Sequence, residues 1–529
     1  MNVKYYRLIT QMQQSSFYPH AVAENIELIQ THASYIFLTG EYAYKVKKNV
    51  NYGFLNYSTL AKRKHFIEAE LQLNKKIAPE LYLEVVPISD RNSKFILGDS
   101  DNIVEYALKM RAFPQEDLFS NLLKERKLSG NDLVELGKIV AHFHNNAKTN
   151  RYISSFGTVE KINIAFQENY RQSEKYIDNV QTKEQFTATK GYTDSFLTQR
   201  QNLFADRIEQ NKIKECHGDL HLRNICLWHD KIQLFDRIEF NESFRFVDTM
   251  YDIAFTVMDL EARGHPEFAN VFLNSYLEHT GDWTGLLVLP LYLSRQAYVR
   301  AKVNSFLLDN PQISEADRQE AKKAASDYYR QAYQYTQSKP GKLILISGLS
   351  GSGKSTVARE IAKNIGAIQQ ARGTCRNKFG VSALQIRSDA IRKHLAGISL
   401  DESGTNSIYT PEMTQKTYDR LLELGITLTK AGYTVILDAK YDRLALRQPV
   451  IAQAKTANIP LKIIHCTAPM SVLCDRLKQR HNDISDATAD LIASQQKKAE
   501  TFTTAERAFV IEIDTSSTNW RETLKAIQI

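Results

Sequence analysis

The stretch Gly348-Leu349-Ser350-Gly351-Ser352-Gly353-Lys354-Ser355-Thr356 constrains the fold more than any other part of the chain. It follows an apolar run at 343–346 and precedes an amphipathic segment at 357–365. A glycine-rich turn between an apolar strand and a helix is typical of a phosphate-binding P-loop, because its backbone N–H groups can point inward at phosphate oxygens. We therefore expect the loop to bind a nucleoside triphosphate.

Each residue type in this loop has an expected role. Gly348, Ser350, Gly351, Ser352, Gly353 and Thr356 would form the cradle around the phosphates. Lys354 would contact the β- and γ-phosphates, and the Ser355 hydroxyl would ligate Mg²⁺. The cofactors expected from the sequence are thus ATP and Mg²⁺.

Length and composition limit the wider possibilities. A chain of 529 residues exceeds one hydrophobic core, so two or three domains are expected. The net charge of +8 suits anionic substrates such as nucleotides, and it permits a nucleic-acid partner without indicating one. Five scattered cysteines indicate free thiols in a reducing compartment. We find no signal-peptide core and no run long enough for a membrane span, so we expect a cytoplasmic protein of unknown oligomeric state.

The front of the chain reads as a mixture of strands and helices. Strands are expected at 35–38 and 42–46, around a Gly40-Glu41 turn, and later at 82–87, 94–97 and 102–110. Ser58 is expected to cap a helix that runs to about residue 77. After Pro114 the pattern turns helical, as at 133–147. Ser314 and Asp317 resemble a capping box for a helix that ends near 337.

We place a domain boundary at Ser338-Lys339-Pro340, which divides the chain into domains at 1–337 and 341–529. Beyond it, strands are expected at 343–347, 384–387, 434–438, 462–466 and 510–514, with helices between them. Alternating strands and helices predict a five-stranded parallel sheet covered on both faces.

A second group of polar residues lies in the front domain. The sequence His217-Gly218-Asp219 is followed by Asn224 and, at the end of an apolar strand, by Asp236. Phosphoryl transfer needs a carboxylate near the attacking hydroxyl and oxygen ligands for Mg²⁺. One alternative is an ordinary polar loop. Another is a zinc site of Cys216, His217, His221 and Cys226, although their spacing matches no structural zinc pattern.

These residues resemble the signature of aminoglycoside phosphotransferases and choline-kinase-like enzymes, the small-molecule branch of the protein-kinase fold. The resemblance implies that Asp219 is the catalytic base and that Asn224 and Asp236 are Mg²⁺ ligands. The segment Tyr42-Ala43-Tyr44-Lys45 resembles the strand that carries the ATP-binding lysine, so Lys45 is the expected phosphate contact. Lys47 is the alternative, because it lies on the same side of that strand.

On the following helix, Glu70 shares a face with apolar residues and is expected to pair with Lys45. Glu68, or an ordinary surface role for Glu70, are the alternatives.

Two features depart from protein kinases. The chain has Thr31-His32-Ala33-Ser34 in place of a glycine-rich loop, and Asp236-Arg237-Ile238 in place of Asp-Phe-Gly. Acidic residues that would suit a cationic acceptor, or equally a solvated surface, are Glu239, Glu242, Asp248 and Asp252.

The back domain resembles small P-loop kinases: gluconate kinase, polynucleotide 5′-kinase, chloramphenicol phosphotransferase and zeta-toxin-like enzymes. The resemblance implies that Asp389 accepts the acceptor's proton and that Arg392 grips an anionic group, although both also fit an ordinary helix start. Asp438 ends a strand where an acid could reach Mg²⁺ through water. Arg476 and Arg480 stand where related kinases carry lid arginines, or they form a solvated basic face.

The whole layout resembles bifunctional aminoglycoside phosphotransferase/ATP-binding proteins: an α+β protein-kinase-like domain followed by an α/β P-loop kinase domain. It implies that both halves transfer the γ-phosphoryl group of ATP to hydroxyl groups of unidentified acceptors. One alternative is a front half that binds nucleotide only to regulate the other. Another is a back half that phosphorylates nucleic-acid ends, with Arg372, Arg376 and Lys378 as contacts.

Overall fold

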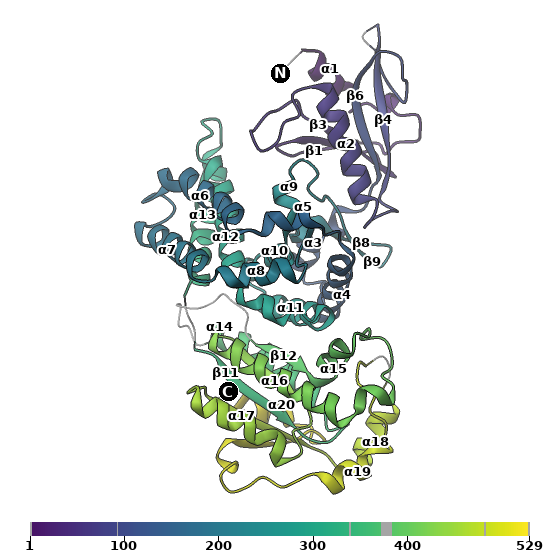
Figure 1. Ribbon diagram of the computed structural model, residues 1–529. Coiled ribbons are helices and arrows are strands. Elements are labelled where there is room, and N and C mark those ends of the chain that lie inside the picture. The colour runs from purple at the N-terminus through teal and green to yellow at the C-terminus, as the bar shows by residue number, and fades with distance from the viewer. Residues whose placement is uncertain (1–2, 93, 338–339, 372–382, 481–482, 527–529) are drawn as a thin grey trace. The chain divides into compact units, whose positions relative to one another are not determined.

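The computed structural model describes residues 3–92, 94–337, 340–371, 383–480 and 483–526 (Figure 1). By internal contacts the chain forms two compact units. The first comprises residues 1–129, 146–158 and 206–256, and the second comprises 130–145, 159–205 and 257–529. The expected boundary residues Ser338 and Lys339, together with Cys375, lie outside the described residues.

The first unit is built on a six-stranded antiparallel sheet with the order β1-β2-β3-β6-β4-β5. Its strands are β1 (Glu27–Gln30), β2 (Ser34–Leu38), β3 (Tyr42–Lys47), β4 (Tyr82–Arg91), β5 (Lys94–Leu97) and β6 (Ile103–Arg111). Helix α1 (Val3–Gln11) packs Leu8 and Ile9 on one face, and α2 (Leu60–Asn74) packs Ile67 on the other. The sheet is therefore covered on both faces, which buries the strand residues between two helices.

Two details of this sheet differ from the sequence-based expectation. Strand β1 was not expected, and it forms by antiparallel pairing with β2. The cap of α2 is Thr59 and not Ser58, because the Thr59 hydroxyl accepts a hydrogen bond from the Lys62 N–H, while the Ser58 hydroxyl donates to Asn56. The helix also ends at Asn74, three residues before the expected end.

The rest of the first unit consists of short elements around two two-stranded sheets. The pairs are β8 with β9 and β7 with β10, all antiparallel. The elements are α3 (Phe119–Lys124), α5 (Arg151–Ser154), β7 (Ile213–Glu215), β8 (Ile225–Trp228), β9 (Lys231–Leu234), α9 (Glu242–Arg245), β10 (Phe246–Asp248) and the start of α10 (Thr249–Ala262).

The second unit begins with a set of helices. They are α4 (Gly130–Asn146), α6 (Val159–Ser173), α7 (Lys183–Gln199), the first part of α8 (Gln201–Glu209), α11 (Pro266–Thr280), α12 (Leu289–Leu307) and α13 (Glu315–Tyr335). Ser314 caps α13 by accepting a hydrogen bond from the Asp317 N–H, as the sequence predicts. Helices α12 and α13 pack along each other, and the Ser294 hydroxyl donates to the Ala332 carbonyl.

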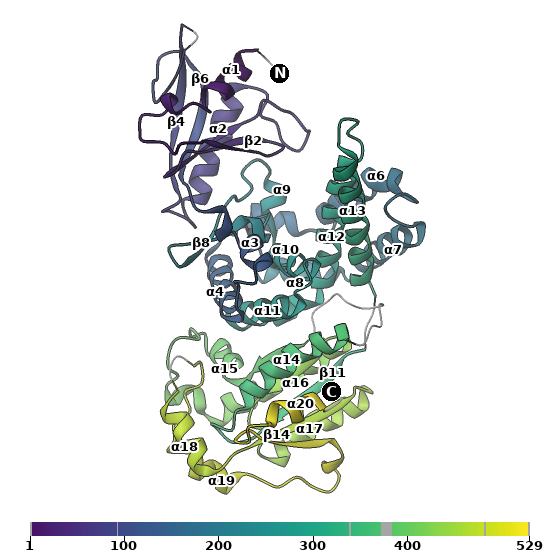
Figure 2. The same cartoon turned by 180° about the vertical axis from the view of Figure 1, so that it is seen from behind.

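The same unit contains a five-stranded parallel sheet with the order β12-β13-β11-β14-β15 (Figure 2). Its strands are β11 (Lys342–Ser347), β12 (Leu384–Arg387), β13 (Thr434–Asp438), β14 (Leu461–Thr467) and β15 (Val510–Asp514). Each lies within one residue of the strand expected from the sequence. The helices around them are α14 (Lys354–Ala371), α15 (Ser388–Ala396), α16 (Pro411–Lys430), α17 (Leu444–Thr456), α18 (Met470–Lys478), α19 (Leu491–Lys498) and α20 (Trp520–Ala526).

Opposite faces of this parallel sheet are covered by different helices. Val357 of α14 and Leu524 of α20 pack against Ile344 and its neighbours. On the other face, Gly425 of α16 lies against Leu343 and Leu437. A parallel sheet buried on both faces brings the carboxyl ends of its strands to one edge, where such folds place their ligands.

No helix in the described ranges combines the length and apolar character that a bilayer span requires.

Candidate active sites

In the first unit, two lysines of β3 share one carboxylate of α2. Lys45 Nζ lies 2.7 Å from Glu70 Oε1, and Lys47 Nζ lies 2.7 Å from Glu70 Oε2. The lysines are two residues apart, so both point to the same side of the strand. Glu70 is fully buried, whereas Glu68 is half exposed and lies 3.9 Å from Lys64.

The two lysines differ in their second partner. Lys45 Nζ lies 2.6 Å from Asp236 Oδ1, while Lys47 Nζ lies 2.5 Å from Glu239 Oε1. Glu239 also accepts a hydrogen bond from the Tyr57 hydroxyl. Lys45 is thus the lysine that reaches Asp236, and Lys47 belongs to a more deeply buried cluster.

Charges in this network offset the cost of burial. Burial lowers the pKa of Lys45, but Asp236 and Glu70 outweigh it and hold that pKa well above its usual value. Burial raises the pKa of Glu70, but Lys45 and Lys47 outweigh it and hold that pKa low. Lys45, Lys47 and Glu70 are therefore all charged at neutral pH, and in this buried cluster the opposite charges compensate one another.

The loop that carries Asp219 is held by its backbone. The Asp252 carboxylate accepts hydrogen bonds from the N–H groups of His217 (3.0 Å) and Gly218 (2.8 Å). Gly218 has φ +87°, and a Cβ there would lie 2.6 Å from the Phe244 carbonyl oxygen, so only glycine fits. The Asn224 side-chain NH₂ donates to the backbone oxygen of Asp219 (2.9 Å) and to its Oδ2 (3.1 Å).

The segment with Asp236 is tied to this loop. The N–H of Phe235 donates to the Asn224 carbonyl, and the N–H of Ile238 donates to the His217 carbonyl, both at 3.1 Å. His217 Nε2 lies 2.9 Å from the Phe235 carbonyl oxygen. Asp236 lies between these tethers, which brings it beside the loop of Asp219 and Asn224.

Asp236 is also held in an uncommon backbone conformation. Its φ is +63°, and its N–H donates to the Tyr82 hydroxyl at 3.0 Å. The next residue, Arg237, is buried and donates to the carbonyl oxygens of Leu73, Glu215 and Cys216. Arg237 therefore anchors the position at which protein kinases carry phenylalanine.

The other acidic residues of this region have internal partners. Asp248 forms a buried ion pair with Arg207 at 2.5 Å, and Asp252 holds the His217 loop. Glu239 pairs with Lys47, and Glu242 accepts from the Tyr152 hydroxyl. Glu239, Asp248 and Asp252 are therefore bonded to protein groups, and they fit neither a site for a cationic acceptor nor a solvated surface. The ring nitrogens of His217 and His221 likewise have protein partners, which argues against zinc.

In the second unit, the phosphate loop follows β11 and leads into α14. Gly348, Gly351 and Gly353 all have positive φ, and a Cβ on Gly348 would lie 2.4 Å from the Cys466 carbonyl oxygen. Lys354 Nζ donates to the Leu349 carbonyl at 2.7 Å across the loop. Burial lowers the pKa of Lys354, while Asp438 and Asp389 act in the opposite direction. Asp438 of β13 is in register with Ile346 of β11, two residues before Gly348.

The remaining loop positions have distinct surroundings. The N–H of Ser350 donates to Gln495 Oε1 of α19 at 3.1 Å, and the Ser352 carbonyl accepts from the Thr515 hydroxyl at 3.0 Å. Ser355 is half-buried and Thr356 is exposed in the first turn of α14.

Arg476 of α18 contacts the loop directly. Its guanidinium donates to the Thr515 hydroxyl (2.8 Å), to the Thr515 carbonyl (2.9 Å) and to the Gly351 carbonyl (3.3 Å). Arg480 lies just beyond α18. Burial raises the pKa of Asp483, but Arg387 and, to a smaller extent, Arg480 outweigh it and lower that pKa. Arg476 is therefore built into the loop's support and is not a solvated side chain.

Asp389 and Asp438 stand at the ends of neighbouring strands. Arg387 of β12 is in register with Asp438 of β13, and Asp389 follows in the first turn of α15. Burial raises the pKa of Asp389, Arg387 opposes the shift, and Asp438 adds to it. Asp438 accepts from the Gln385 side chain at 2.8 Å.

Arg392 is buried one turn further along α15. It donates to the Ile408 carbonyl at 2.9 Å and lies 5.0 Å from the ring centre of Tyr409. Its Nε is buried and has no hydrogen-bond partner within the part of the chain that the structure describes.

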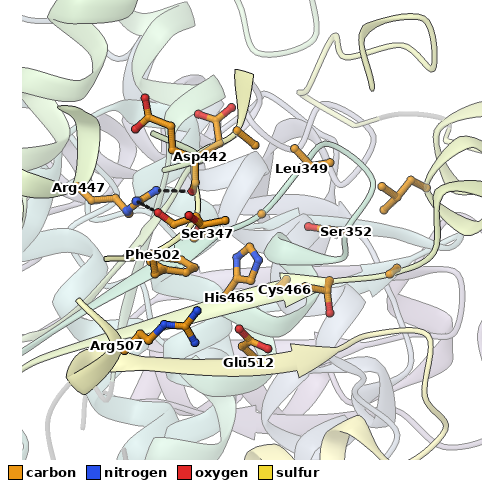
Figure 3. Close-up of a pocket in the computed structure, with 17 residues that line it drawn as sticks. Ser347, Leu349, Ser352, Asp442, Arg447, His465, Cys466, Phe502, Arg507 and Glu512 are labelled. Carbon is orange, nitrogen blue, oxygen red and sulfur yellow. Dashed lines mark hydrogen bonds between the residues drawn. The ribbon is translucent and has the colours of Figure 1, made fainter. Parts of the chain in front are cut away.

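A cavity of about 310 Å³ lies behind the phosphate loop (Figure 3). Gly348, Leu349 and Ser352 of the loop border it, and Arg447, Phe502 and His465 surround it from other elements. Arg447 is fully buried and forms an ion pair with Glu506 at 2.6 Å. Sequence reasoning missed this cavity, because its lining comes from separate segments between 347 and 512.

A family model described as an AAA domain matches residues 343–502. Over 511 residues, 95% of each chain, the protein is 27% identical to an uncharacterized protein of Mycobacterium tuberculosis (strain ATCC 25618 / H37Rv).

Among solved structures, a choline/ethanolamine kinase family protein from Mesorhizobium loti is similar over 62% of this chain and 99% of its own, with 11% identity and a TM-score of 0.36. A sugar kinase from Janibacter sp. HTCC2649 is similar over 35% of this chain and 91% of its own, with 21% identity and a TM-score of 0.25.

The fold and the phosphate loop define an ATP-dependent kinase, in the broad class of phosphotransferases. More particularly, the chain joins an α+β fold with a six-stranded antiparallel sheet to a P-loop domain whose five-stranded sheet is all parallel, and the parallel sheet expected from the sequence is confirmed.

Proposed function

We propose that the protein transfers the γ-phosphoryl group of ATP to hydroxyl groups at two separate sites, one in each of the domains 1–337 and 341–529. The observation that carries the proposal is in the back half. There the phosphate loop follows β11, Asp438 ends β13 and Asp389 lies in the first turn of the helix after β12, so all three lie at the carboxyl ends of neighbouring parallel strands.

In the back half, Asp389 accepts the proton of the acceptor hydroxyl. The oxygen of that hydroxyl attacks the γ-phosphorus, and the bond between the γ-phosphorus and the oxygen that leaves with ADP breaks. Burial raises the pKa of Asp389, which moves its basicity toward that of an effective general base. Lys354 moves from the Leu349 carbonyl to the phosphates. Arg392 offers its buried Nε donor to an anionic acceptor group. Arg476, which supports the phosphate loop through Gly351 and Thr515, contacts the bound nucleotide together with Arg480.

In the front half, Asp219 is the base. Lys45 contacts the phosphates, and Glu70 holds Lys45 in place. Lys45 must exchange its bond with Asp236 for the nucleotide, while Lys47 keeps its buried partners Glu70 and Glu239.

The residues present fit a divalent cation in both halves. Because the Asn224 NH₂ is committed to Asp219, its Oδ1 is the atom that can serve as ligand. Together with the Asp236 carboxylate it offers the hard oxygen donors that Mg²⁺ prefers. In the back half the donors are the Ser355 hydroxyl and the Asp438 carboxylate. When bound, Mg²⁺ neutralises charge on the β- and γ-phosphates.

Calorimetric titration of the full chain with AMP-PNP and Mg²⁺ tests the number of sites. We expect two binding equivalents for the unmodified protein, one for Lys354→Ala, one for Lys45→Met and none for the double variant. Lys323→Ala, at an exposed position of α13, serves as the matched control and should retain both. A single equivalent in the unmodified protein would contradict the two-site proposal.

Turnover is tested on a panel of hydroxyl-bearing acceptors. Asp219→Asn and Asp389→Asn should each lower phosphoryl transfer at their own site by about 10²–10⁴-fold without loss of ATP binding.

A second candidate function makes the front half a nucleotide-binding regulator. The anchoring of Arg237 favours it, because the segment after Asp236 is fixed by three carbonyl groups. That reading predicts ATP binding that depends on Lys45 and no Asp219-dependent turnover on any acceptor.

We also place the protein in the cytoplasm, where ATP is supplied and the free thiols of Cys216, Cys226, Cys466 and Cys474 stay reduced.

A further inference from the structure

Helix α11 covers the outer edge of strand β12. This strand ends the parallel sheet, and among the described residues its strand partner is β13 on the inner side. The Asn270 side-chain NH₂ donates to the Ala383 carbonyl at 2.7 Å, and the Asn274 NH₂ donates to the same oxygen at 3.0 Å. Asn274 Oδ1 accepts from the Gln385 N–H at 2.7 Å. Two carboxamides therefore satisfy backbone groups that a neighbouring strand would otherwise pair.

One turn further along, the same helix reaches the charged end of β12. Glu278 Oε1 lies 3.5 Å from Arg387 Nη1, and Asp483 Oδ1 accepts from Arg387 Nη2 at 2.6 Å. Burial lowers the pKa of Arg387, but Glu278 and Asp483 outweigh it and raise that pKa. Glu278 and Asp483 thus hold Arg387 from two sides.

Helix α11 also contacts α15, whose first turn carries Asp389. His394 Nε2 of α15 lies 2.7 Å from the Glu278 carbonyl oxygen. At the end of α11, Gly281 has φ +66°, and a Cβ there would lie 3.0 Å from His394 Nδ1. The helix therefore contacts the chain on both sides of Asp389, at 383–387 and at 394.

These contacts lead directly to the two carboxylates of the back site. Gln385, whose N–H is held by Asn274, donates its side-chain NH₂ to Asp438 Oδ2 at 2.8 Å. Arg387, which is held by Glu278, is the charge that most opposes the effect of burial on Asp389. A displacement of β12 would therefore move Asp389 relative to the phosphate loop and would change the hydrogen bond that Gln385 donates to Asp438.

We propose that α11 is a positioning element of the P-loop kinase: Asn270, Asn274 and Glu278 set the geometry of Asp389 and Asp438 without touching the reactants. This inference rests on the proposed function of the back half. It makes phosphoryl transfer in that half dependent on a helix of the domain at 1–337, whose Asn274 lies 111 residues before its partner Gln385. Well-placed reacting groups are worth large factors in rate, and a misplacement of about 1 Å can cost 10²-fold.

The test uses the full chain with Lys45→Met, which silences the front site, and follows ATP hydrolysis with water as the acceptor. Asn270→Leu/Asn274→Leu should lower kcat by about 10–100-fold, with the KM for ATP changed less than about threefold. Asn274→Asp, which keeps the acceptor for the Gln385 N–H, should lower kcat less. This variant keeps the test informative if the double leucine variant does not fold. Glu267→Gln on the first turn of α11 is the matched control and should change neither constant.

A pH profile separates positioning from mere stability. Glu278→Gln removes a negative charge beside Arg387, so the pKa of Asp389 should fall and the acid limb of kcat should move to lower pH. Asp389→Asn is the reference. If Asp389→Asn lowers kcat but the α11 variants leave kcat and its acid limb unchanged, the positioning role is overturned and the proposed function stands. If Asp389→Asn has no effect, the proposed function of this site falls, and the inference falls with it.

Discussion

The shared carboxylate of Glu70 gives the sharpest prediction on stability. Its side chain is fully buried between Lys45 and Lys47, each 2.7 Å away. Glu70→Gln keeps the shape and removes the charge, which leaves two buried ammonium groups to Asp236 and Glu239. Removing one partner of a buried ion pair costs about 3–5 kcal/mol. Because each lysine retains one carboxylate, we expect about 3 kcal/mol, the lower end of that range.

The assay is urea unfolding of the full chain, with hydrogen exchange of peptides that cover β3 and α2 to locate the change. Glu68→Gln is the matched control. Glu68 is half exposed and 3.9 Å from its lysine, so this change should cost at most about 1 kcal/mol. A loss for Glu70→Gln no greater than for Glu68→Gln would refute the reasoning.

The same variant has a pH signature whose sign is fixed. The pKa of Glu70 is lowered from 4.5 to about 2, so its contribution to stability is fully present above pH 4.5. That contribution is lost as the pH falls from 4.5 through about 2. The difference in stability between the unmodified protein and Glu70→Gln should therefore shrink over this window.

Further predictions concern the loops and the buried charges. Gly218→Ala should destabilise the protein by about 2 kcal/mol or more and abolish Asp219-dependent turnover, because the new Cβ would meet the Phe244 carbonyl oxygen. Thermal unfolding measures the loss, and Gly191→Ala, which has open space around it, is the control. Arg447→Met should cost about 3–5 kcal/mol by leaving Glu506 buried and unpaired, whereas Arg420→Met on an exposed pair should cost less than about 1 kcal/mol in urea titrations. If the back half acts on nucleic-acid ends, oligonucleotide binding should weaken steeply as the salt concentration rises, and binding that is absent or independent of salt would contradict that hypothesis. The expected contacts Arg372, Arg376 and Lys378 lie outside the described residues.

Much of the fold could be predicted from local patterns. Each strand of the parallel sheet is a short apolar run followed by polar residues at its carboxyl end. The sequence therefore predicts each end of these strands to within one residue of its position in the structure. Strand β1, with the sequence Glu-Leu-Ile-Gln, has little strand pattern of its own and depends on pairing with β2. The choice of Thr59 over Ser58 as cap is a matter of which hydroxyl faces the Lys62 N–H, and two adjacent hydroxyl residues look alike in sequence.

The sites show the same division. Motif residues such as Asp219 and Lys354 could be named because their spacing is local. The partners that set their environment could not, because they are remote. Glu239 lies 192 residues from Lys47, and Asn274 lies 111 residues from Gln385. Nothing in the pattern of α11 indicates that its asparagines lie against a sheet edge, since an asparagine on a helix is usually a solvated residue.

The covered edge of β12 has a consequence for any attempt to study the back half alone. A fragment that starts at residue 341 would lose α11, and with it the two carboxamides that occupy the Ala383 carbonyl and the Gln385 N–H. The exposed strand would then offer its backbone to a second copy of itself. Self-association of the fragment, suppressed when the helices that precede it are retained, is the behaviour that this edge dictates.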